Sequence, residues 1–283
     1  MQSIVLLTVN YNAADWVAQL WESARSHDAA TTLLIVNNSP QDTAVHKLAA
    51  PRVVILEAGE NLGFGAACNL GLRWIDEQSR GAIVWLINPD AQLTPGAIQA
   101  AQEVFIAHPQ AAIVGTIVQE PNGQLWFGGG RFHASTGAIV ATDLFATSEA
   151  DYLPCDWVTG CSLLLNLAQF AACPQFDPAY FLYYEDFDFC RRYAQMGHTI
   201  AITRTIQVIH APSSIADRDP AFKFQCSTAS YLLTLERYTS GLTLLLRLVR
   251  LGLHSLILLP FRPQTAIGKW RGIAQYLRRK RRE

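Results

Sequence analysis

The sequence lacks the cysteine pattern of a disulfide-built or zinc-binding protein. Its six cysteines are scattered, with no CxxC pair and no histidine-rich tract beside them, and no signal-like segment opens the chain. We therefore expect reduced thiols, a cytoplasmic location and no structural zinc site. Nothing repeats at a fixed period and no low-complexity stretch occurs, which argues against a repeat architecture.

Two common phosphate-binding motifs are missing as well. Glycines cluster in ENLGFGAACNLG, residues 60–71, but without the GxGxxG fingerprint of dinucleotide-binding proteins or the lysine of the P-loop. Neither a Rossmann dehydrogenase nor a P-loop NTPase is therefore indicated. The N-terminal region also has no glycine loop rich in lysine and arginine, which argues against a nucleotidyltransferase.

A long uninterrupted apolar run is absent too. Residues 241–260, GLTLLLRLVRLGLHSLILLP, are rich in leucine but contain Arg247, Arg250 and His254, whereas a membrane-spanning helix needs roughly 18 apolar residues. We therefore expect no transmembrane helix. The three polar residues recur at three- and four-residue spacing, which places them on one helical face opposite leucines.

Charge is divided unevenly along the chain. Residues 243–283 hold ten Lys or Arg and one Glu, whereas residues 1–242 hold twelve Lys or Arg and twenty-two acids. We expect residues 241–283 to form a basic amphipathic helical tail on an anionic membrane surface, which would make the protein peripheral on the cytosolic face. The alternative is a helix whose polar face packs against the rest of the protein. Because the tail has few aromatics and no recognition motif, we do not expect a nucleic-acid partner.

The first ninety residues alternate short apolar runs with helical patterns. The run at residues 81–90, GAIVWLINPD, is almost continuously apolar, as in a parallel strand covered on both faces. Strands separated by helices predict an α/β fold with a doubly wound, mostly parallel sheet flanked by helices. The expected strands are 3–10, 31–39, 52–59, 81–90, 111–118 and one strand or strand pair over 198–210; the expected helices are 14–27, 65–79, 93–109 and 183–197, and short antiparallel strands and loops are expected over 119–156.

Polar residues follow each of the expected parallel strands, at 10–12, 37–39, 57–61 and 88–90. In doubly wound sheets, ligands bind at the carboxyl ends of the strands. The sequence therefore predicts a ligand site along this edge of the sheet.

Residues at this edge have both a functional and an ordinary interpretation. In TVNYN, residues 8–12, asparagine and tyrosine could hydrogen-bond and stack on a nucleobase, or simply end a strand. Asp90 could hold Mg²⁺ or Mn²⁺ together with substrate phosphates, or form an ordinary Asn-Pro-Asp turn. His210 could complete a metal site with Asp90 or contact a phosphate, or be structural.

An acidic cluster in an aromatic surrounding is the second candidate centre. FLYYEDFDFCRR, residues 181–192, places Glu185 and Asp186 at a helix start. Adjacent carboxylates raise each other's pKa by repulsion and partial desolvation, which can give a general base near neutral pH. Acids at a helix N-terminus are also common without any chemistry, because the helix dipole stabilises them.

Six short motifs occur in a characteristic order: TVNYN, VNNS, NLGFGAACNLG, NPD, WVTGCSLLL and YYEDFDFCRR, with VIH behind them. Over residues 3–215 this set resembles the family 2 glycosyltransferases, in particular their bacterial rhamnosyltransferase-like branch. The resemblance implies a GT-A fold, a divalent cation (Mg²⁺ or Mn²⁺) and inversion at the anomeric carbon of a nucleoside-diphosphate sugar. It favours dTDP-rhamnose as donor, with UDP- or GDP-sugars as alternatives, and a glycan or lipid-linked acceptor.

The resemblance also implies roles for individual residues. Asp186 would be the catalytic base with Glu185 beside it, and Asp90 the metal-binding acid, so we expect Asp90 and Asp186 to converge on one pocket. We divide the chain into a glycosyltransferase domain, 1–240, with a nucleotide-sugar half, 1–118, and an acceptor half, 119–240, followed by the tail. The donor-binding residues would be Tyr11, Asn12 and Asn37 at the nucleotide, Asn61, Gly63, Gly65 and Asn69 around the donor loop, and Arg191 or Arg192 with His210 near the diphosphate.

Asn37 departs from the family pattern, which usually has Asp at this position. Its amide can still donate and accept a hydrogen bond, so base recognition is altered rather than excluded. The departure leaves open a second function, a catalytically silent nucleotide-sugar-binding or scaffold protein. The retention of Asp90, Glu185 and Asp186 argues against this alternative.

Overall fold

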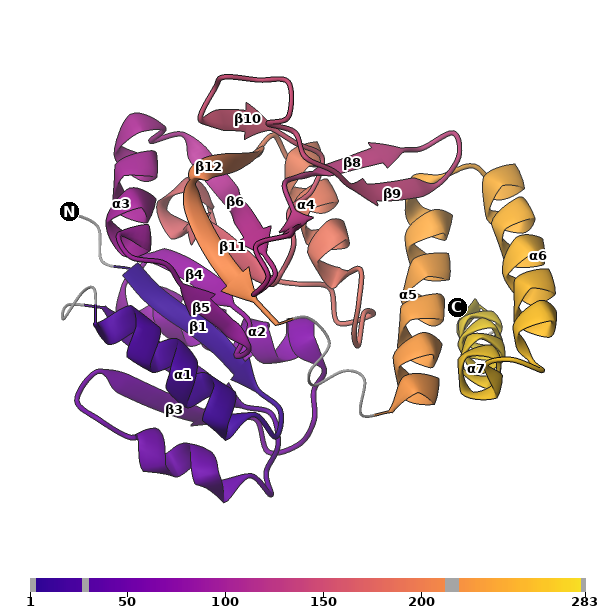
Figure 1. Ribbon diagram of the computed structural model, residues 1–283, viewed down its shortest axis with the longest axis horizontal. Helices are drawn as coiled ribbons and strands as arrows, with labels where there is room; N and C mark the ends of the chain where they lie inside the picture. Colours follow the sequence, from indigo (N-terminus) through magenta and orange to yellow (C-terminus); the bar gives the residue numbers. More distant parts are fainter. Residues whose placement is uncertain (1–3, 27–30, 212–218, 281–283) are drawn as a thin grey trace.

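The computed structural model describes residues 4–26, 31–211 and 219–280. Its centre is one large mixed sheet (Figure 1), in which the main strands lie in the order β10-β12-β6-β11-β4-β1-β2-β3. The neighbouring strands among β1 to β4 are parallel, as are β6 and β12, and β11 runs antiparallel between β4 and β6. The expected mostly parallel α/β sheet is therefore confirmed.

The strands follow the apolar runs of the sequence closely. The central ones are β1 (Ile4–Asn10), β2 (Thr32–Asn37), β3 (Val53–Glu57), β4 (Ile83–Ile87), β6 (Ala111–Gln119), β11 (Ser162–Asn166) and β12 (Thr199–His210). Shorter strands fill the 119–156 region, as expected: β7 (Leu125–Phe127), β10 (Tyr152–Pro154) and a separate hairpin of β8 (Gly130–His133) and β9 (Ala138–Ala141). A further short strand, β5 (Ala91–Leu93), pairs with β12.

Helices cover both faces of the sheet. The hydrophobic core on one face includes residues of α1 (Ala14–Arg25) and α3 (Ala97–Ala107), and the core on the other face includes residues of α2 (Phe64–Gln78) and α4 (Glu185–Gln195). Every residue of β4 is buried, as its continuous apolar run predicted. Two 3₁₀ helices, η1 (Thr43–Leu48) and η2 (Leu167–Gln169), complete the connections.

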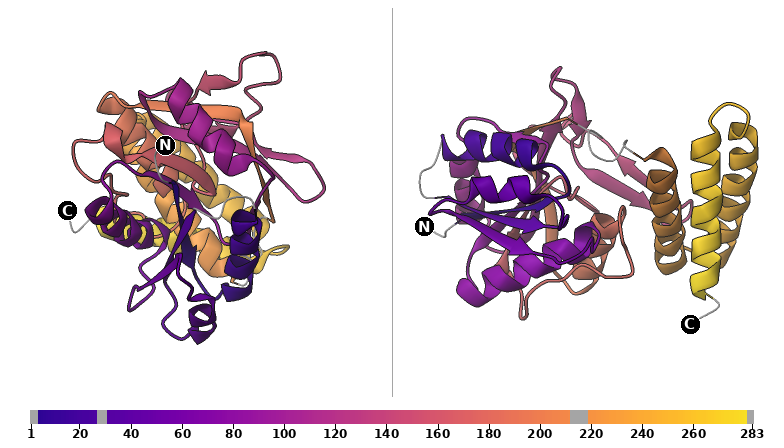
Figure 2. Two further views of the ribbon diagram at one scale, coloured as in Figure 1. Left: turned by 90° about the vertical axis from the view of Figure 1, so that its left-hand side faces the viewer. Right: turned by 90° about the horizontal axis from the view of Figure 1, so that it is seen from below.

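Three long helices form the C-terminal part and stand beside the sheet domain (Figures 1 and 2). They are α5 (Pro220–Tyr238), α6 (Gly241–Leu258) and α7 (Pro263–Lys280), and they share a small hydrophobic cluster built on Leu232, Ile273 and Tyr276. The expected helical tail is thus present, although α5 was not predicted and packs with it. The boundary at residue 240 stays a prediction.

Helix α6 bears on the expectation that the chain has no transmembrane helix, which stays a prediction. By length and composition it is apolar enough to cross a membrane, and only 11% of its 18 residues are buried. Two arginines interrupt the run, but the surrounding leucines keep its average character apolar. A single helix of this kind is weak evidence for a membrane span. The exposure of its apolar side chains says more about what this helix contacts.

Candidate active site

The segment before α4 has a strained backbone. Tyr183 and Tyr184 have φ angles of 69° and 64°, in a left-handed region that bulky residues rarely adopt. Each such residue costs roughly 1–3 kcal/mol and persists only where its surroundings fix it. The two tyrosines directly precede Glu185 and Asp186, the first residues of α4. Strain of this kind concentrates at functional sites, which supports a special role for the acidic pair.

The two acids differ in their surroundings. Asp186 is half-buried and accepts hydrogen bonds from the backbone N–H groups of Gly160 (2.8 Å) and Phe187 (2.7 Å). Glu185 is buried, and one of its carboxyl oxygens has no hydrogen-bond partner among the described residues. Burial, followed by the negative charge of Asp186, raises the pKa of Glu185 to about 8. Burial therefore favours the neutral form of Glu185 at neutral pH. Burial raises the pKa of Asp186 as well, while its two hydrogen bonds from backbone N–H groups favour the ionised form and lower that pKa.

Asp90 and His210 form a second buried pair. Strand β12 pairs with β5 so that His210 lies opposite Ala91, the neighbour of Asp90. His210 Nε2 is consequently 3.1 Å from Asp90 Oδ1, and the imidazole and the Trp126 ring pack in a T-shaped arrangement. The other imidazole nitrogen, Nδ1, has no hydrogen-bond partner in the part of the chain that the structure describes. The sequence-based pairing of these two residues is borne out as a contact.

The Asp90–His210 pair fits the divalent cation that the resemblance implies. A carboxylate oxygen suits Mg²⁺ or Mn²⁺, and a transition ion such as Mn²⁺ also accepts an imidazole nitrogen. Within residues 4–26, 31–211 and 219–280, no cluster of three His, Cys, Asp or Glu side chains could hold an ion. Substrate phosphates and water would have to supply the other ligands, which is how Mg²⁺ is commonly bound beside nucleotides.

The acidic pair and the Asp90–His210 pair meet around one loop. Asp186 accepts its hydrogen bond from Gly160, and the next residue, Cys161, accepts one at its carbonyl from Asn88 N–H (2.9 Å), two residues before Asp90. Burial, and then the charges of Asp90 and Asp186, raise the pKa of the Cys161 thiol. The loop thus links Asp186 to the segment before Asp90, and the convergence of the two acids on one pocket stays a prediction.

Asn37 lies in a chain of side-chain hydrogen bonds at the ends of β1, β2 and β3. Its oxygen accepts from Asn10 (3.0 Å) and its amide nitrogen donates to Glu57 (2.9 Å). Asn10 also donates to Asp42 (3.0 Å). Asn37 is fully buried, and its side-chain amide is hydrogen-bonded at both ends. Glu57, which accepts one of these hydrogen bonds, is the exposed acid beside it. Glu57, the last residue of β3, was not among the residues predicted for the site.

Tyr11 and Asn12 follow at the end of β1. The Tyr11 side chain is 42% exposed, which leaves its ring available for stacking. Asn12 has a φ angle of 50°, and its backbone N–H donates to the Ser39 hydroxyl (3.0 Å). Their assignment to the nucleotide stays a prediction.

The glycines of the donor loop have a different explanation from the one that the sequence suggested. A Cβ on Gly63 would lie 2.1 Å from the carbonyl oxygen of Phe181, and one on Gly65 would lie 2.9 Å from Phe176 Cβ. Asn69 is also engaged, since it exchanges two hydrogen bonds with the Phe176 backbone. These residues therefore let the segment before α4 approach helix α2, rather than making room for a ligand.

Asn61 supports the same junction from within the loop. Its side-chain oxygen accepts from Asn38 (3.0 Å) and from the backbone N–H of Gly63 (3.0 Å). The Phe64 N–H, at the start of α2, donates to the carbonyl of Phe181 (3.0 Å). The N-terminus of α2 is thus capped by the chain itself at this position.

We expect Gly63→Ala to destabilise the protein. Gly63 has a φ angle of 80° and no space for a methyl group, so the free energy of unfolding should fall by more than about 1 kcal/mol. Thermal unfolding would measure it. Gly81→Ala is the matched control, because nothing lies within 4 Å of its added Cβ and its φ is not positive. Equal melting temperatures for the two variants would contradict the close approach described here.

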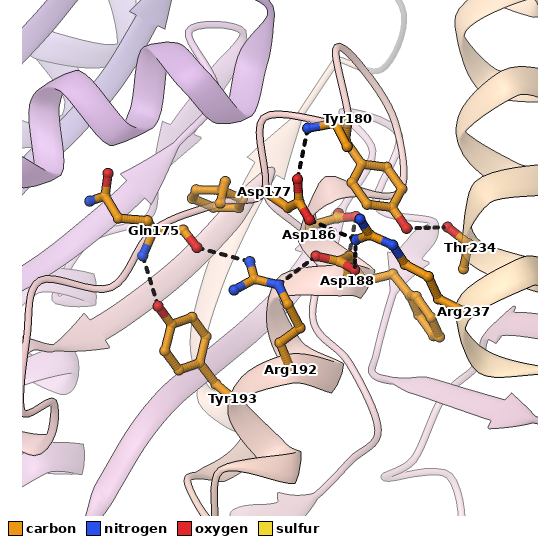
Figure 3. Close-up of polar contacts among 12 residues, drawn as sticks. Gln175, Asp177, Tyr180, Asp186, Asp188, Arg192, Tyr193, Thr234 and Arg237 are labelled. Carbon is orange, nitrogen blue, oxygen red and sulfur yellow. Dashed lines mark hydrogen bonds and ion pairs between the residues drawn. The ribbon is translucent and has the colours of Figure 1, made fainter. Parts of the chain in front are cut away.

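The two arginines of α4 are engaged by other groups. Arg192 donates to the Asp188 carboxylate (2.7 Å) and to the carbonyl of Gln175 (2.8 Å) (Figure 3). Arg191 lies 3.5 Å from Asp156. Among the described contacts, neither is paired with the Asp90–His210 site. Arg192 therefore holds α4 in place, and the expected position of these arginines beside a diphosphate gains no support.

Helix α5 holds the strained segment from the other side. Ser230 donates to the carbonyl of Leu182 (2.9 Å), and Thr234 donates to the hydroxyl of Tyr180 (3.2 Å) (Figure 3). Sequence reasoning missed this helix. A signal was present, because Asp219 precedes Pro220 and caps the first turn, a typical start of a helix.

Comparison with known families identifies the sheet domain. The family model described as "Glycosyl transferase family 2" matches residues 3–157, more than half of the 283 residues. The chain belongs to this glycosyltransferase family. The matched part includes Asn37 and Asp90 and ends before Asp186. The assignment of Asp186 as the catalytic base therefore depends on the geometry described above.

Two curated proteins are similar to this chain in sequence. It is 28% identical over 199 residues to the N-acetylglucosaminyl-diphospho-decaprenol L-rhamnosyltransferase of Mycobacterium tuberculosis, with 60% of this chain and 62% of that protein aligned. It is 20% identical over 214 residues to the low-salt glycan biosynthesis hexosyltransferase Agl10 of Haloferax volcanii, covering 74% and 67%. The similarity thus spans about three fifths of the rhamnosyltransferase.

Solved structures resemble this family 2 chain in fold. One is GalNAc-T7 with UDP, GalNAc and Mn²⁺, with a TM-score of 0.63, 10% identity, and 83% of this chain and 48% of that one covered. Another is the mannosyltransferase PcManGT of Pyrobaculum calidifontis with GDP-Man and Mn²⁺, with a TM-score of 0.58, 13% identity, and 98% and 87% covered. The expected GT-A fold is confirmed.

Proposed function

We propose that the protein is an inverting glycosyltransferase that moves a sugar from a nucleoside-diphosphate donor to a hydroxyl group of a glycan or lipid-linked acceptor. The observation that carries the proposal is the hydrogen-bonded loop at Gly160 and Cys161, which links Asp186 to Asn88, two residues before Asp90. The rhamnosyltransferase relative favours rhamnose, with dTDP-rhamnose as donor, whereas the names of the structural neighbours keep UDP- and GDP-sugars as alternatives. We place the reaction in the cytoplasm.

Asp186 acts as the general base in this proposal. Its carboxylate takes the proton of the acceptor hydroxyl while the acceptor oxygen forms a bond to the anomeric carbon. The bond from that carbon to the diphosphate breaks on the opposite face, so the configuration inverts and the nucleoside diphosphate leaves. The N–H groups of Gly160 and Phe187 orient the carboxylate, and base catalysis of this kind contributes about 10²–10⁴-fold.

Asp90 and His210 would hold the divalent cation, Mg²⁺ or Mn²⁺. When bound, such an ion stabilises the negative charge that develops on the departing diphosphate. The buried position of both side chains limits competition from water, which strengthens electrostatic interactions at this point. Both structural neighbours are described as complexes that contain a nucleotide or nucleotide sugar together with Mn²⁺, which supports the proposal.

We expect donor binding to depend on the cation through Asp90. A thermal-shift series with dTDP-rhamnose, UDP-sugars and GDP-sugars should show a rise in melting temperature for one donor class, and only with Mn²⁺ or Mg²⁺. A ligand at 100 times its Kd stabilises the native state by about 2.7 kcal/mol. Asp90→Asn should lose this cation-dependent shift, whereas the exposed Glu77→Gln should retain it.

Two outcomes would count against the proposal in different ways. A shift that is equal with and without the cation would remove Asp90 and His210 from a metal site. Donor binding without donor hydrolysis or transfer to any acceptor would favour the alternative, a silent nucleotide-sugar-binding protein.

A further inference from the structure

Helix α6 presents a continuous apolar stripe to solvent. Its side chains are unusually exposed for their type: Leu242 is 67%, Leu246 62% and Ile257 66% exposed. The exposed side chains recur every three or four residues, with adjacent pairs at Leu245–Leu246 and Leu256–Ile257, so they share one face of the helix. The full stripe consists of Leu242, Leu245, Leu246, Val249, Leu253, Leu256 and Ile257.

The opposite face of α6 is fixed to the protein, which determines the direction of the stripe. Leu244, Leu248 and Leu251 pack on the hydrophobic cluster shared with α5 and α7. Arg247 donates to the carbonyl of Thr136 (2.8 Å), in the turn between β8 and β9. The helix lies at the outer side of the three-helix unit in Figure 1. Its apolar stripe therefore points away from the protein.

A row of cationic and imidazole groups borders the stripe. Arg250 and His254 line an open groove on α6 together with the apolar side chains of Leu246, Val249, Leu253 and Ile257. The neighbouring α7 contributes further positive charge, and its Lys269 lies 3.1 Å from His254. Residues 243–283 carry ten Lys or Arg against a single acid.

We propose that this stripe is a docking surface for an anionic lipid bilayer. The apolar side chains would enter the boundary of the acyl chains, while Arg250 and the basic residues of α7 would meet the negative headgroups, the usual arrangement of interfacial helices. The charge along the stripe argues for lipid over a second copy of this chain, because two copies packed stripe to stripe would bring their arginines together. The contacts of Leu244, Leu248 and Leu251 favour a helix lying on the membrane over one crossing it.

This surface is independent of the proposed transfer reaction. If the acceptor is lipid-linked, binding to the bilayer would bring the enzyme to its acceptor, a consequence that rests on the proposed function. Helix α5 lies between the base segment and the other two helices (Figure 2), so a bound bilayer would be on the side of the molecule that holds the acidic pair in place.

The test is co-sedimentation of the full chain with vesicles of phosphatidylcholine alone and of phosphatidylcholine mixed with phosphatidylglycerol. We expect binding to the anionic vesicles and at least about tenfold weaker binding to the neutral ones. The double variant Leu246→Glu with Leu253→Glu should bind the anionic vesicles at least about tenfold more weakly than wild type. The matched control is Ile106→Glu with Met196→Glu, two equally exposed apolar residues outside the tail, which should bind as wild type does.

Arg250 separates the charge contribution from the apolar one. Arg250→Glu should weaken binding to the anionic vesicles, and Arg250→Lys should restore it. Melting temperatures and turnover of a soluble acceptor should be unchanged in the stripe variants, because these side chains are exposed. The proposal is overturned by equal binding of wild type and the double variant, or by equal binding to both vesicle types. It is also overturned by a lipid-free dimer in light scattering that Leu246→Glu dissociates, which would make a second copy the occupant.

Discussion

Asp186→Asn removes sugar transfer while leaving donor binding intact. The amide cannot take a proton from the acceptor hydroxyl, so kcat should fall by roughly 10²–10⁴-fold. Its size and shape match those of the carboxylate, and its single oxygen can keep one of the two hydrogen bonds, since Gly160 and Phe187 donate to different carboxylate oxygens. Initial rates beside donor calorimetry measure both quantities. A variant that keeps near-full turnover would contradict the role of Asp186 as base.

Glu185→Gln distinguishes the base from its neighbour. Since the pKa of Glu185 is raised to about 8, its neutral form dominates at pH 7 and the amide resembles that form. We expect this variant to lose much less activity at pH 7 than Asp186→Asn.

The pH dependence of the transfer rate should show the titration of Asp186 and of Glu185 as two separate transitions. In wild type, the rate should rise with pH as Asp186 loses its proton, at a pKa above that of an ordinary aspartic acid because of burial. Above pH 8 Glu185 ionises as well and places a second negative charge beside the base. Glu185→Gln should remove this second transition and leave the first. A profile unchanged by the substitution would show that Glu185 does not titrate next to Asp186.

The contact between Asp90 and His210 at the strand ends was predictable because it depends on local sequence patterns. Apolar runs of five to twelve residues gave the main strands, and in parallel sheets their carboxyl ends meet at one edge. Asp90 and His210 are at the ends of two such runs, so the topology alone brought them together. The link from Asp186 to the segment before Asp90 required more, namely the loop at Gly160 and Cys161, whose contacts no periodicity reveals.

The donor-loop glycines show where local reasoning failed. A glycine with positive φ is identifiable from sequence only as a turn, and the group that fills the space beside it can come from any part of the chain. For Gly63 that group is Phe181, more than a hundred residues away. The direction in which the leucines of α6 point is likewise not readable from the sequence, because it depends on the packing of α6 against α5 and α7.

Asp188 is the residue whose importance the sequence concealed most. It was one of three acids at the start of a helix, where acids are common, yet it is fully buried. Its carboxylate accepts hydrogen bonds from Arg192 (2.7 Å), from Arg237 (2.9 Å) and from the hydroxyl of Tyr238 (2.8 Å) (Figure 3). The last two residues belong to α5, so this single acid joins the base helix to the C-terminal helices.

Asp188→Asn should therefore lower the free energy of unfolding by about 3 kcal/mol, since it leaves Arg192 facing a neutral amide and leaves Arg237 only its ion pair with Asp177. This value is at the lower end for buried ion pairs, because the side chains of Arg192 and Arg237 are 24% and 27% exposed. Urea unfolding measures it. Glu22→Gln, which breaks the exposed ion pair with Arg25, is the matched control and should cost at most about 1 kcal/mol.

The same variant tests whether the strained segment depends on α5. Tyr183 and Tyr184 can keep their left-handed conformation only while the elements around them hold it, and Asp188 anchors α5 one turn beyond them. Transfer activity at a temperature where Asp188→Asn is still folded should fall, because Asp186 loses its fixed position, while cation-dependent donor binding at Asp90 persists. Loss of stability with full activity in the folded fraction would mean that the bond from Asp188 to α5 stabilises the fold without positioning the base.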